Sequence, residues 1–174
     1  MAEPSKEKSL RGAKDGFVEA MMMNIALLRR RIRDNALIFK IYAVGDVTKT
    51  DVALAYMKDR ADQDMVKKMD QTLKQLRLRG LTVTEQTLVE ALTGKKLSWC
   101  NPFPKVRYSQ RPDIIAAHVE EGKLAVIVDN SPTVILLPAG IFDFLQDIDD
   151  YYFPLLTGNY FRFLRILNLS LIHI

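Results

Sequence analysis

Two long segments of the chain repeat apolar residues at alternating steps of three and four, which places those side chains on one side of a helix. The first covers residues 17–33. The second follows Asp62, a residue suited to capping a helix, and continues to Gly80, a residue type that commonly ends one. The apolar positions are Val18, Met21, Ile25, Leu28 and Ile32 in the first segment and Val66, Met69, Leu73 and Leu76 in the second. We therefore predict two amphipathic helices.

Four shorter segments have the character of β-strands. Residues 37–44 are rich in strand-forming side chains and precede a Gly-Asp turn signal, and residues 51–57 alternate larger and smaller side chains. Residues 124–128 and 133–137 are continuously apolar, a pattern typical of strands buried on both faces of a sheet. The turn between these last two strands consists of residues that suit a tight turn, Asp129, Asn130, Ser131 and Pro132.

Further helices are expected at residues 82–92, 112–122, 141–146 and from 159 onward. A capping box of Thr82 and Glu85 opens the first of these, and Pro112 suits the first turn of the second. The alternation of helices and strands predicts an α/β fold, in which the helices that begin near Val18 and Asp62 cover a small mixed sheet.

The composition is that of an ordinary globular domain. The 174 residues are 48% hydrophobic and 26% charged, enough to bury a core without a disulfide or a metal. Cys100 is the single cysteine and the two histidines are His118 and His173, so no group of residues has the spacing of a zinc or haem site. The charged N-terminus lacks the apolar segment of a signal peptide. We expect neither a metal nor a cofactor.

Two places carry side chains that could bind a small molecule. Asp129 ends an apolar strand, where α/β folds often place functional acids, and Asn130 follows it. The Asp129 carboxylate could instead accept hydrogen bonds from the amides of its own turn. Arg111 and Asp113 form the second candidate pair. Neither a glycine-rich phosphate loop nor a paired acid and base accompanies them, so we expect no catalytic residues.

Arg29, Arg30, Arg31 and Arg33 form a basic cluster in the last turns of the first predicted helix, where the helix dipole favours positive charge. Three interpretations stay open: a solvated helix end, a nucleic-acid contact, or a contact with anionic lipid or an acidic neighbouring subunit. The cluster lacks interleaved aromatic residues for base stacking, and the net charge of the chain is only +4. We therefore expect no nucleic-acid partner.

Tyr151 and Tyr152 stand beside a group of aspartates towards the C-terminus. Aromatic residues with a charged rim are common at protein interfaces, so this corner is a candidate partner contact. It could equally be a loop whose aromatic rings fold back onto the core.

The chain ends in an apolar run, ILNLSLIHI, which follows Arg162 and Arg165. Basic residues followed by an apolar run are typical of a membrane helix that begins on its cytoplasmic side. The alternative is a final amphipathic helix that packs on the core. No stretch reaches the ~18 to 20 consecutive apolar residues that a complete span needs.

Residues 101–154, NPFPKVRYSQRPDIIAAHVEEGKLAVIVDNSPTVILLPAGIFDFLQDIDDYYFP, closely resemble the soluble N-terminal region of A-type subunits in the GerA family of spore germination proteins. Residues 10–34, LRGAKDGFVEAMMMNIALLRRRIRD, are similar to the first helix of the same region. The resemblance extends from about residue 10 to residue 168.

This resemblance implies a domain of an inner spore membrane protein that acts in germination. Family members of this type work with partner subunits in sensing nutrients and releasing ions, and their membrane part is thought to form a conducting homo-oligomer. The resemblance makes residues 16–158 a soluble α/β domain on the cytoplasmic (core) side. Residues 159–174 become a pre-membrane helix and the truncated start of the first transmembrane span, and residues 1–15 a linker or the tail of a missing upstream subdomain.

A different class of function is also open. The chain could be a stand-alone small-molecule-binding α/β domain, or an enzyme, that uses Asp129 and the segment from Arg111 to Asp113. An RNA-binding module would need a basic face on the folded sheet and strongly salt-dependent binding.

Overall fold

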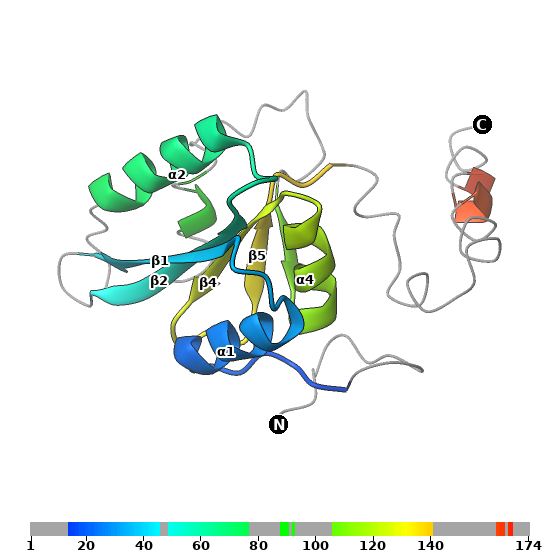
Figure 1. Ribbon diagram of the computed structural model, residues 1–174, viewed down its shortest axis with the longest axis horizontal. Helices are drawn as coiled ribbons and strands as arrows, with labels where there is room; N and C mark the ends of the chain where they lie inside the picture. The colour runs from blue at the N-terminus through cyan, green and yellow to red at the C-terminus, as the bar shows by residue number, and fades with distance from the viewer. Residues whose placement is uncertain are drawn as a thin grey trace.

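The structure, a computed structural model, describes residues 14–45, 49–76, 88–90, 92, 106–140, 163–165 and 167–168. In this part of the chain a five-stranded sheet lies between helices, with α2 over one face and α1 and α4 against the other (Figure 1). The elements are α1 (Met21–Arg31), β1 (Leu37–Val44), β2 (Thr50–Met57), α2 (Gln63–Gln75), β3 (Arg107–Ser109), α4 (Pro112–Glu120), β4 (Leu124–Val128) and β5 (Val134–Leu137). The prediction of an α/β fold with helices covering a sheet is confirmed.

The sheet is antiparallel in all four of its pairings, so the prediction of a mixed sheet is wrong. The strands lie in the order β1-β2-β4-β5-β3, and each strand runs antiparallel to its neighbours. Short connections join β1 to β2 and β4 to β5, and such connections give antiparallel pairs. Helix α4 does link two strands that point the same way, β3 and β4. Because β5 lies between them, no parallel pair forms.

The sequence patterns did not predict β3. This strand has only three residues, and it pairs with β5 through Tyr108 and Ile135. So short a segment shows no periodicity, and only its partner strand defines it.

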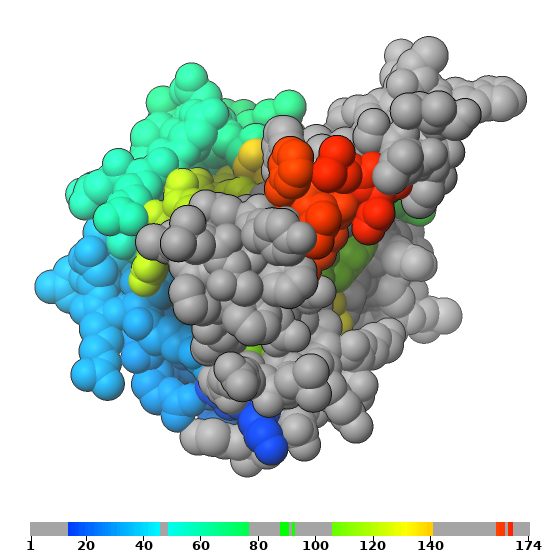
Figure 2. All heavy atoms as spheres, turned by 90° about the vertical axis from the view of Figure 1, so that its right-hand side faces the viewer, coloured from blue at the N-terminus to red at the C-terminus, as the bar shows by residue number. Residues whose placement is uncertain are grey.

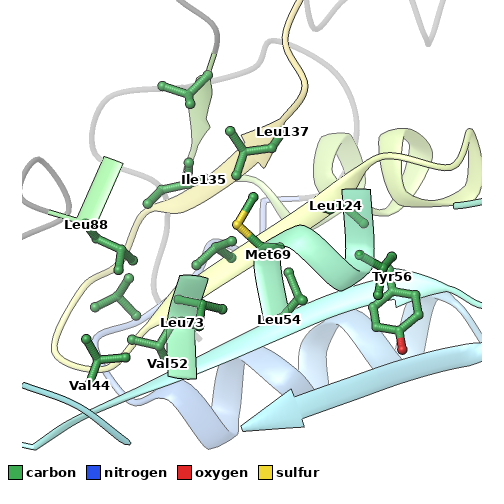
Figure 3. Packing of buried hydrophobic residues seen from close by; sticks show 14 of the residues in the cluster. Val44, Val52, Leu54, Tyr56, Met69, Leu73, Leu88, Leu124, Ile135 and Leu137 are labelled. Carbon is green, nitrogen blue, oxygen red and sulfur yellow. The ribbon is translucent and has the colours of Figure 1, made fainter. Parts of the chain in front are cut away.

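The core on the α2 face joins the apolar stripe of the helix to alternate residues of the strands. Val66, Met69 and Leu73, all in the predicted stripe, are buried. Figure 3 shows Met69 and Leu73 facing the sheet, where the labelled strand residues are Val44, Val52, Leu54, Tyr56, Leu124, Ile135 and Leu137. The helix stripe and the strand alternation therefore meet in one cluster.

The core on the opposite face uses smaller strand residues. Ala53 and Ala55 of β2 and Ala125 of β4 point towards α1 and α4, and their short side chains leave room for the helices to lie close. Leu28 of α1 and Ile115 of α4 are fully buried against them. Every residue of β4 and β5 is buried as a result. The prediction that these two strands are covered on both faces is therefore confirmed.

Helix α1 begins later than its apolar spacing predicts. The side chain of Asn24 accepts a hydrogen bond from the Val18 amide at 2.8 Å and donates one to the Val18 carbonyl at 2.6 Å. These two bonds satisfy the Val18 backbone outside the helix, so α1 begins only at Met21, after an extended Ala20. At the other end Ile32 is also extended, although its side chain remains buried.

Asp62 caps α2 as predicted, because its carboxylate accepts hydrogen bonds from the amides of Asp64 and Met65. The helix ends at Gln75, earlier than Gly80, which lies outside the described residues. Leu76 adopts an extended backbone and packs against the core, so it leaves the helix before the glycine.

Several predicted elements fall wholly or partly outside the described residues. Residues 88–90 and 92, in the segment predicted as a helix at 82–92, are helical, and so are residues 163–165 and 167–168 near the C-terminus. The predicted helix at residues 141–146 lies outside the described part of the chain. Among the helices that the structure describes, none combines the length and the apolar character needed to cross a membrane.

Candidate functional site

Asp129 lies at the end of β4 and caps a distant helix. Its Oδ1 accepts a hydrogen bond from the Met21 amide at 3.0 Å, the first residue of α1. Ala20, at the N-cap position of that helix, has no side-chain oxygen to do so. The next residue, Asn130, has a positive φ of 61° and donates its amide to the Glu19 carbonyl at 2.9 Å. The turn after β4 therefore holds the start of α1.

Arg111 is fully buried at the start of α4 and pairs with Asp113. Its Nε donates to Asp113 Oδ1 at 3.0 Å, and a second guanidinium nitrogen contacts Oδ2 of the same carboxylate. A bidentate pair of this kind fixes the orientation of both the guanidinium plane and the carboxylate plane. The Arg111 amide also donates to the Ser109 hydroxyl at 3.1 Å. Arg111 thus joins the end of β3, through Ser109, to the first turn of α4, through Asp113.

The four candidate binding residues come together at one end of the sheet. In the register of the sheet, Ser109 lies opposite Val134, and Val134 lies opposite Ile127, so β3 ends at the same edge as β4. Residues 17–19 cross this end, since the Phe17 amide donates to the Gln110 carbonyl and the Glu19 carbonyl accepts from the turn after β4. The contacts described above bind these residues to the protein's own backbone or, in the Arg111–Asp113 pair, to each other.

Loss of the Asp129 carboxylate should weaken α1. Asp129→Ala removes the cap of the Met21 amide, and we expect a loss of about 1 kcal/mol in the free energy of unfolding, the usual value of a helix cap. Asp129→Asn keeps an acceptor oxygen and should lose less. Urea denaturation followed by circular dichroism measures both. Equal stability of Asp129→Ala and the unchanged protein would contradict the capping role.

The arginine cluster divides into residues with different contacts. Arg29 lies between α1 and β1, where it donates to the Asp34 carbonyl at 2.9 Å and the Leu37 carbonyl at 2.8 Å. Its guanidinium also stands over the ring of Phe39, 5.3 Å from the centroid. Arg29 therefore fastens the connection between the helix and the strand.

Arg30 and Arg31 both pair with Asp15, whose side chain is nearly buried, and the Arg30 distance is 2.7 Å. These contacts fold the N-terminal segment against the end of α1. Arg33 is exposed, and its Nε lies 3.4 Å from the Arg30 carbonyl. Arg29, Arg30 and Arg33 are exposed, whereas Arg31 is more buried.

A polar cluster between β1 and α2 was not predicted. Asp70 of α2 accepts hydrogen bonds from Lys74 at 2.7 Å and from the Tyr42 hydroxyl, and Lys40 lies 3.4 Å away. Figure 2 shows the two elements as neighbouring parts of the surface, with the segment around β1 in light blue and α2 in teal. The hydrogen bonds from Lys74 and Tyr42 lower the pKa of Asp70 to about 2. Burial and the bond to Asp70 raise the pKa of Tyr42 above its ordinary value.

The cluster predicts a specific acid sensitivity. The pKa of Asp70 is about 2 in the folded protein, below its ordinary value of 3.8. The unfolded chain, in which the ordinary value applies, therefore binds the proton more readily. The stabilisation is therefore complete above about pH 4 and is lost as the pH falls towards 2. Asp70→Asn should flatten the fall of stability over this window, measured by urea denaturation at each pH. Asp64→Asn, on the same helix with an exposed carboxylate, is the matched control and should keep the steep fall.

His118 is fully buried on α4 and was expected to be part of no metal site. Its Nδ1 lies 3.0 Å from a Glu121 carboxylate oxygen, and its Nε2 lies 3.3 Å from an Arg107 guanidinium nitrogen. Burial lowers the pKa of His118 below its ordinary value. The neutral ring can then donate to Glu121 and accept from Arg107, which links β3 to the end of α4.

Neither metal ligation nor the tyrosine corner gains support from the described residues. Within the described part of the chain, no three His, Cys, Asp or Glu side chains are grouped in a way that could hold a metal ion. Tyr151 and Tyr152 lie outside the described residues, so their role as a partner contact stays a prediction.

Comparison with known proteins places these features in a family. A family model described as the Bacillus/Clostridium GerA spore germination protein matches residues 1–174. Stage V sporulation protein AF of Bacillus subtilis (strain 168) is 41% identical over 167 residues, which are 96% of this chain and 33% of that protein. Spore germination protein KA of the same organism is 33% identical over 165 residues, 95% of this chain and 30% of that protein. The chain therefore spans about a third of the length of these relatives.

A solved structure is also similar. It is the crystal structure of the N-terminal domain of the A subunit of the Bacillus megaterium spore germinant receptor GerK3. The TM-score is 0.57 and the sequence identity 32%, and the match covers 73% of this chain and 98% of that domain. The similarity thus extends over nearly all of a known N-terminal domain.

Proposed function

This chain belongs to the GerA family of spore germination proteins, and we propose that it forms the N-terminal domain of an A-type germination subunit. The observation that carries the proposal is the match to 98% of the solved A-subunit N-terminal domain. In this proposal residues 16–158 are the soluble domain, on the cytoplasmic side of the inner spore membrane. Residues 159–174 approach the membrane, and residues 1–15 precede the domain.

The proposed work of the domain is assembly and signalling rather than catalysis. It would join the subunit to its partners and pass on the nutrient signal that leads to ion release, while the membrane part forms the homo-oligomer. Two features support this. Asp129 and Arg111, the candidate binding groups, contact the protein's own backbone or a neighbouring side chain. The relatives are named as sporulation and germination proteins.

The exposed end of α1 is the proposed partner contact. Arg30 and Arg33 face solvent there, and basic groups at a helix end suit an acidic neighbouring subunit or an anionic lipid surface. We place the acidic subunit first, because Arg30 is held by Asp15 in a fixed position that a specific protein contact can use.

Arg33→Glu in the full-length protein tests this contact. We expect less partner subunit to co-purify from detergent-solubilised spore membranes, and slower ion release after nutrient addition. Lys67→Glu on α2 is the matched control, since it reverses an exposed charge on another helix and should change neither measurement. Retention of both the partner and normal ion release in Arg33→Glu would exclude the arginine contact. Loss of membrane attachment with the partner still bound would indicate lipid instead.

The domain assignment has its own test. Deletion of residues 16–158 from the full-length protein should abolish nutrient-triggered ion release while the membrane part is still inserted. Normal ion release by the deleted protein would contradict the proposed function. Stoichiometric binding of a small molecule by the isolated chain, lost in Asp129→Ala, would favour the alternative of a ligand-binding domain.

A further inference from the structure

Among the residues that the structure describes, none pairs with the outer edge of β1 over several positions. All eight residues of β1 pair with β2, and the Lys58 amide donates to the Ala36 carbonyl in the same register. Partners in an antiparallel ladder alternate between bonded and non-bonded pairs, so the even-numbered residues of β1 bond to β2. The N–H and C=O groups of Phe39, Ile41 and Ala43 therefore point away from it. In the described part of the chain, no strand pairs with this edge.

Arg29 closes one end of the edge. Its guanidinium donates a hydrogen bond to the Leu37 carbonyl, which points away from β2, and stands over the ring of Phe39. The bonding groups that remain accessible are those from Phe39 to Ala43. This stretch is long enough for a short antiparallel pairing with another strand.

Apolar side chains flank the accessible stretch. Ile41 is 53% exposed on the face that carries α1, and Ala43 is exposed beside it. Met22 is 64% exposed, and it lies two helical turns before Arg29 on the same side of α1. Edge strands are usually protected by charges or prolines. The single charge on β1 is Lys40, which is directed to Asp70, and β1 contains no proline.

We propose that the edge of β1 docks a second copy of this chain, antiparallel, about a two-fold axis at Ile41. In this register Ile41 lies opposite Ile41 of the second copy, and Phe39 lies opposite Ala43. All three accessible residues then bond at once. The arrangement is self-complementary, as a two-fold interface must be.

Charge selects this register over its neighbours. With the axis at Ile41, each Lys40 faces Tyr42 of the other copy, beside the Asp70 carboxylate that already binds Tyr42. A shift of the axis to Lys40 would place two lysines opposite each other in a close, non-bonded pair, which is unfavourable. A shift to Tyr42 leaves fewer of the accessible residues paired. The contact is small, so we expect a weak dimer.

Site-specific cross-linking tests the register. In a Cys100→Ser background, Ile41→Cys places the two introduced cysteines directly opposite each other. Their Cα atoms then lie about 5.5 Å apart, the spacing of a hydrogen-bonded antiparallel pair. Ala43→Cys is the matched control on the same strand, because its partner is Phe39 and the two introduced thiols lie about 13 Å apart along the strand. A short thiol cross-linker should give several times more covalent dimer for Ile41→Cys than for Ala43→Cys. Equal yields, or no dimer with either, would overturn the proposal.

Sedimentation of variants without introduced cysteines gives an independent measurement. The weight-average molecular mass should rise with protein concentration. Ile41→Lys should abolish this rise, because it places a charge on the edge of β1. Gln75→Lys adds the same charge to an exposed position of α2 and should keep the association. Thermal melts confirm that each variant is folded. A monomer at every concentration, or association that survives Ile41→Lys, would show that another surface is responsible and would overturn the proposal.

Discussion

Replacing Ile127 by aspartate is expected to abolish the folded state. Ile127 is fully buried in β4, opposite Ala53 of β2 and Val134 of β5. The carboxylate would face α1 and α4 in the cluster that contains Ile127, among apolar side chains such as Leu28 and Ile115. An unpaired buried charge costs several kcal/mol, comparable to the roughly 5–15 kcal/mol stability of a whole domain. Circular dichroism and a thermal melt measure the loss.

Ile41→Asp is the matched control for this change. Ile41 lies in the same cross-strand row, opposite Ala53 on its other side, but more than half of its side chain is exposed. We expect it to change the free energy of unfolding by about 1 kcal/mol or less, since the carboxylate stays hydrated. A cooperative melt of Ile127→Asp, similar to that of Ile41→Asp, would disprove the burial of β4.

Replacing Gly122 by alanine should cause the second largest loss. Gly122 ends α4 with a φ of 101°, a conformation that other residues rarely adopt. An added Cβ would lie 2.6 Å from the Arg60 carbonyl oxygen, which is backbone and cannot rotate away. Backbone strain costs roughly 1–3 kcal/mol and crowding a similar amount, so we expect a loss of about 2–5 kcal/mol in urea denaturation.

Gly45→Ala separates the two contributions to this loss. Gly45 has the same φ of 101°, so its replacement also incurs the backbone strain. The excess destabilisation of Gly122→Ala over Gly45→Ala then reports the contact with Arg60. This contact matters because the Arg60 side chain also donates to the Glu120 carbonyl at 2.7 Å, which joins the end of β2 to the end of α4. Equal losses in the two variants would show that the contact is relieved by a small backbone shift.

Local patterns predicted the parts of the fold that local interactions define. The buried positions Met21 and Leu28 and the stripe on α2 follow from helical spacing alone, and Asp62 caps its own helix. The direction of the strands was not predictable in this way, because pairing joins residues far apart in the chain. The start of α1 was also missed. Its position depends on a bond that Asn24 makes to the Val18 backbone, and apolar spacing carries no record of such a bond.

The candidate site shows the same division. Sequence reasoning selected Asp129 because it ends an apolar strand, yet the partner of its carboxylate is a helix start that no local pattern connects to it. Arg29 was grouped with three other arginines by position, whereas it contacts β1 through the Leu37 carbonyl and the Phe39 ring. The Asp70 cluster combines residues of two elements that are ordinary when each is read alone. Tertiary packing creates these sites.

The cap of α1 also affects the order in which the parts of the protein can fold. The Met21 amide and its Asp129 partner are separated by 108 residues. Synthesis proceeds from the N-terminus, so α1 leaves the ribosome long before β4 and its turn have been made. Until then the helix has neither its cap nor most of the sheet that covers its apolar side, and contacts of such long range form late because closing the loop is costly. Helix α1 is therefore synthesised early and completed late.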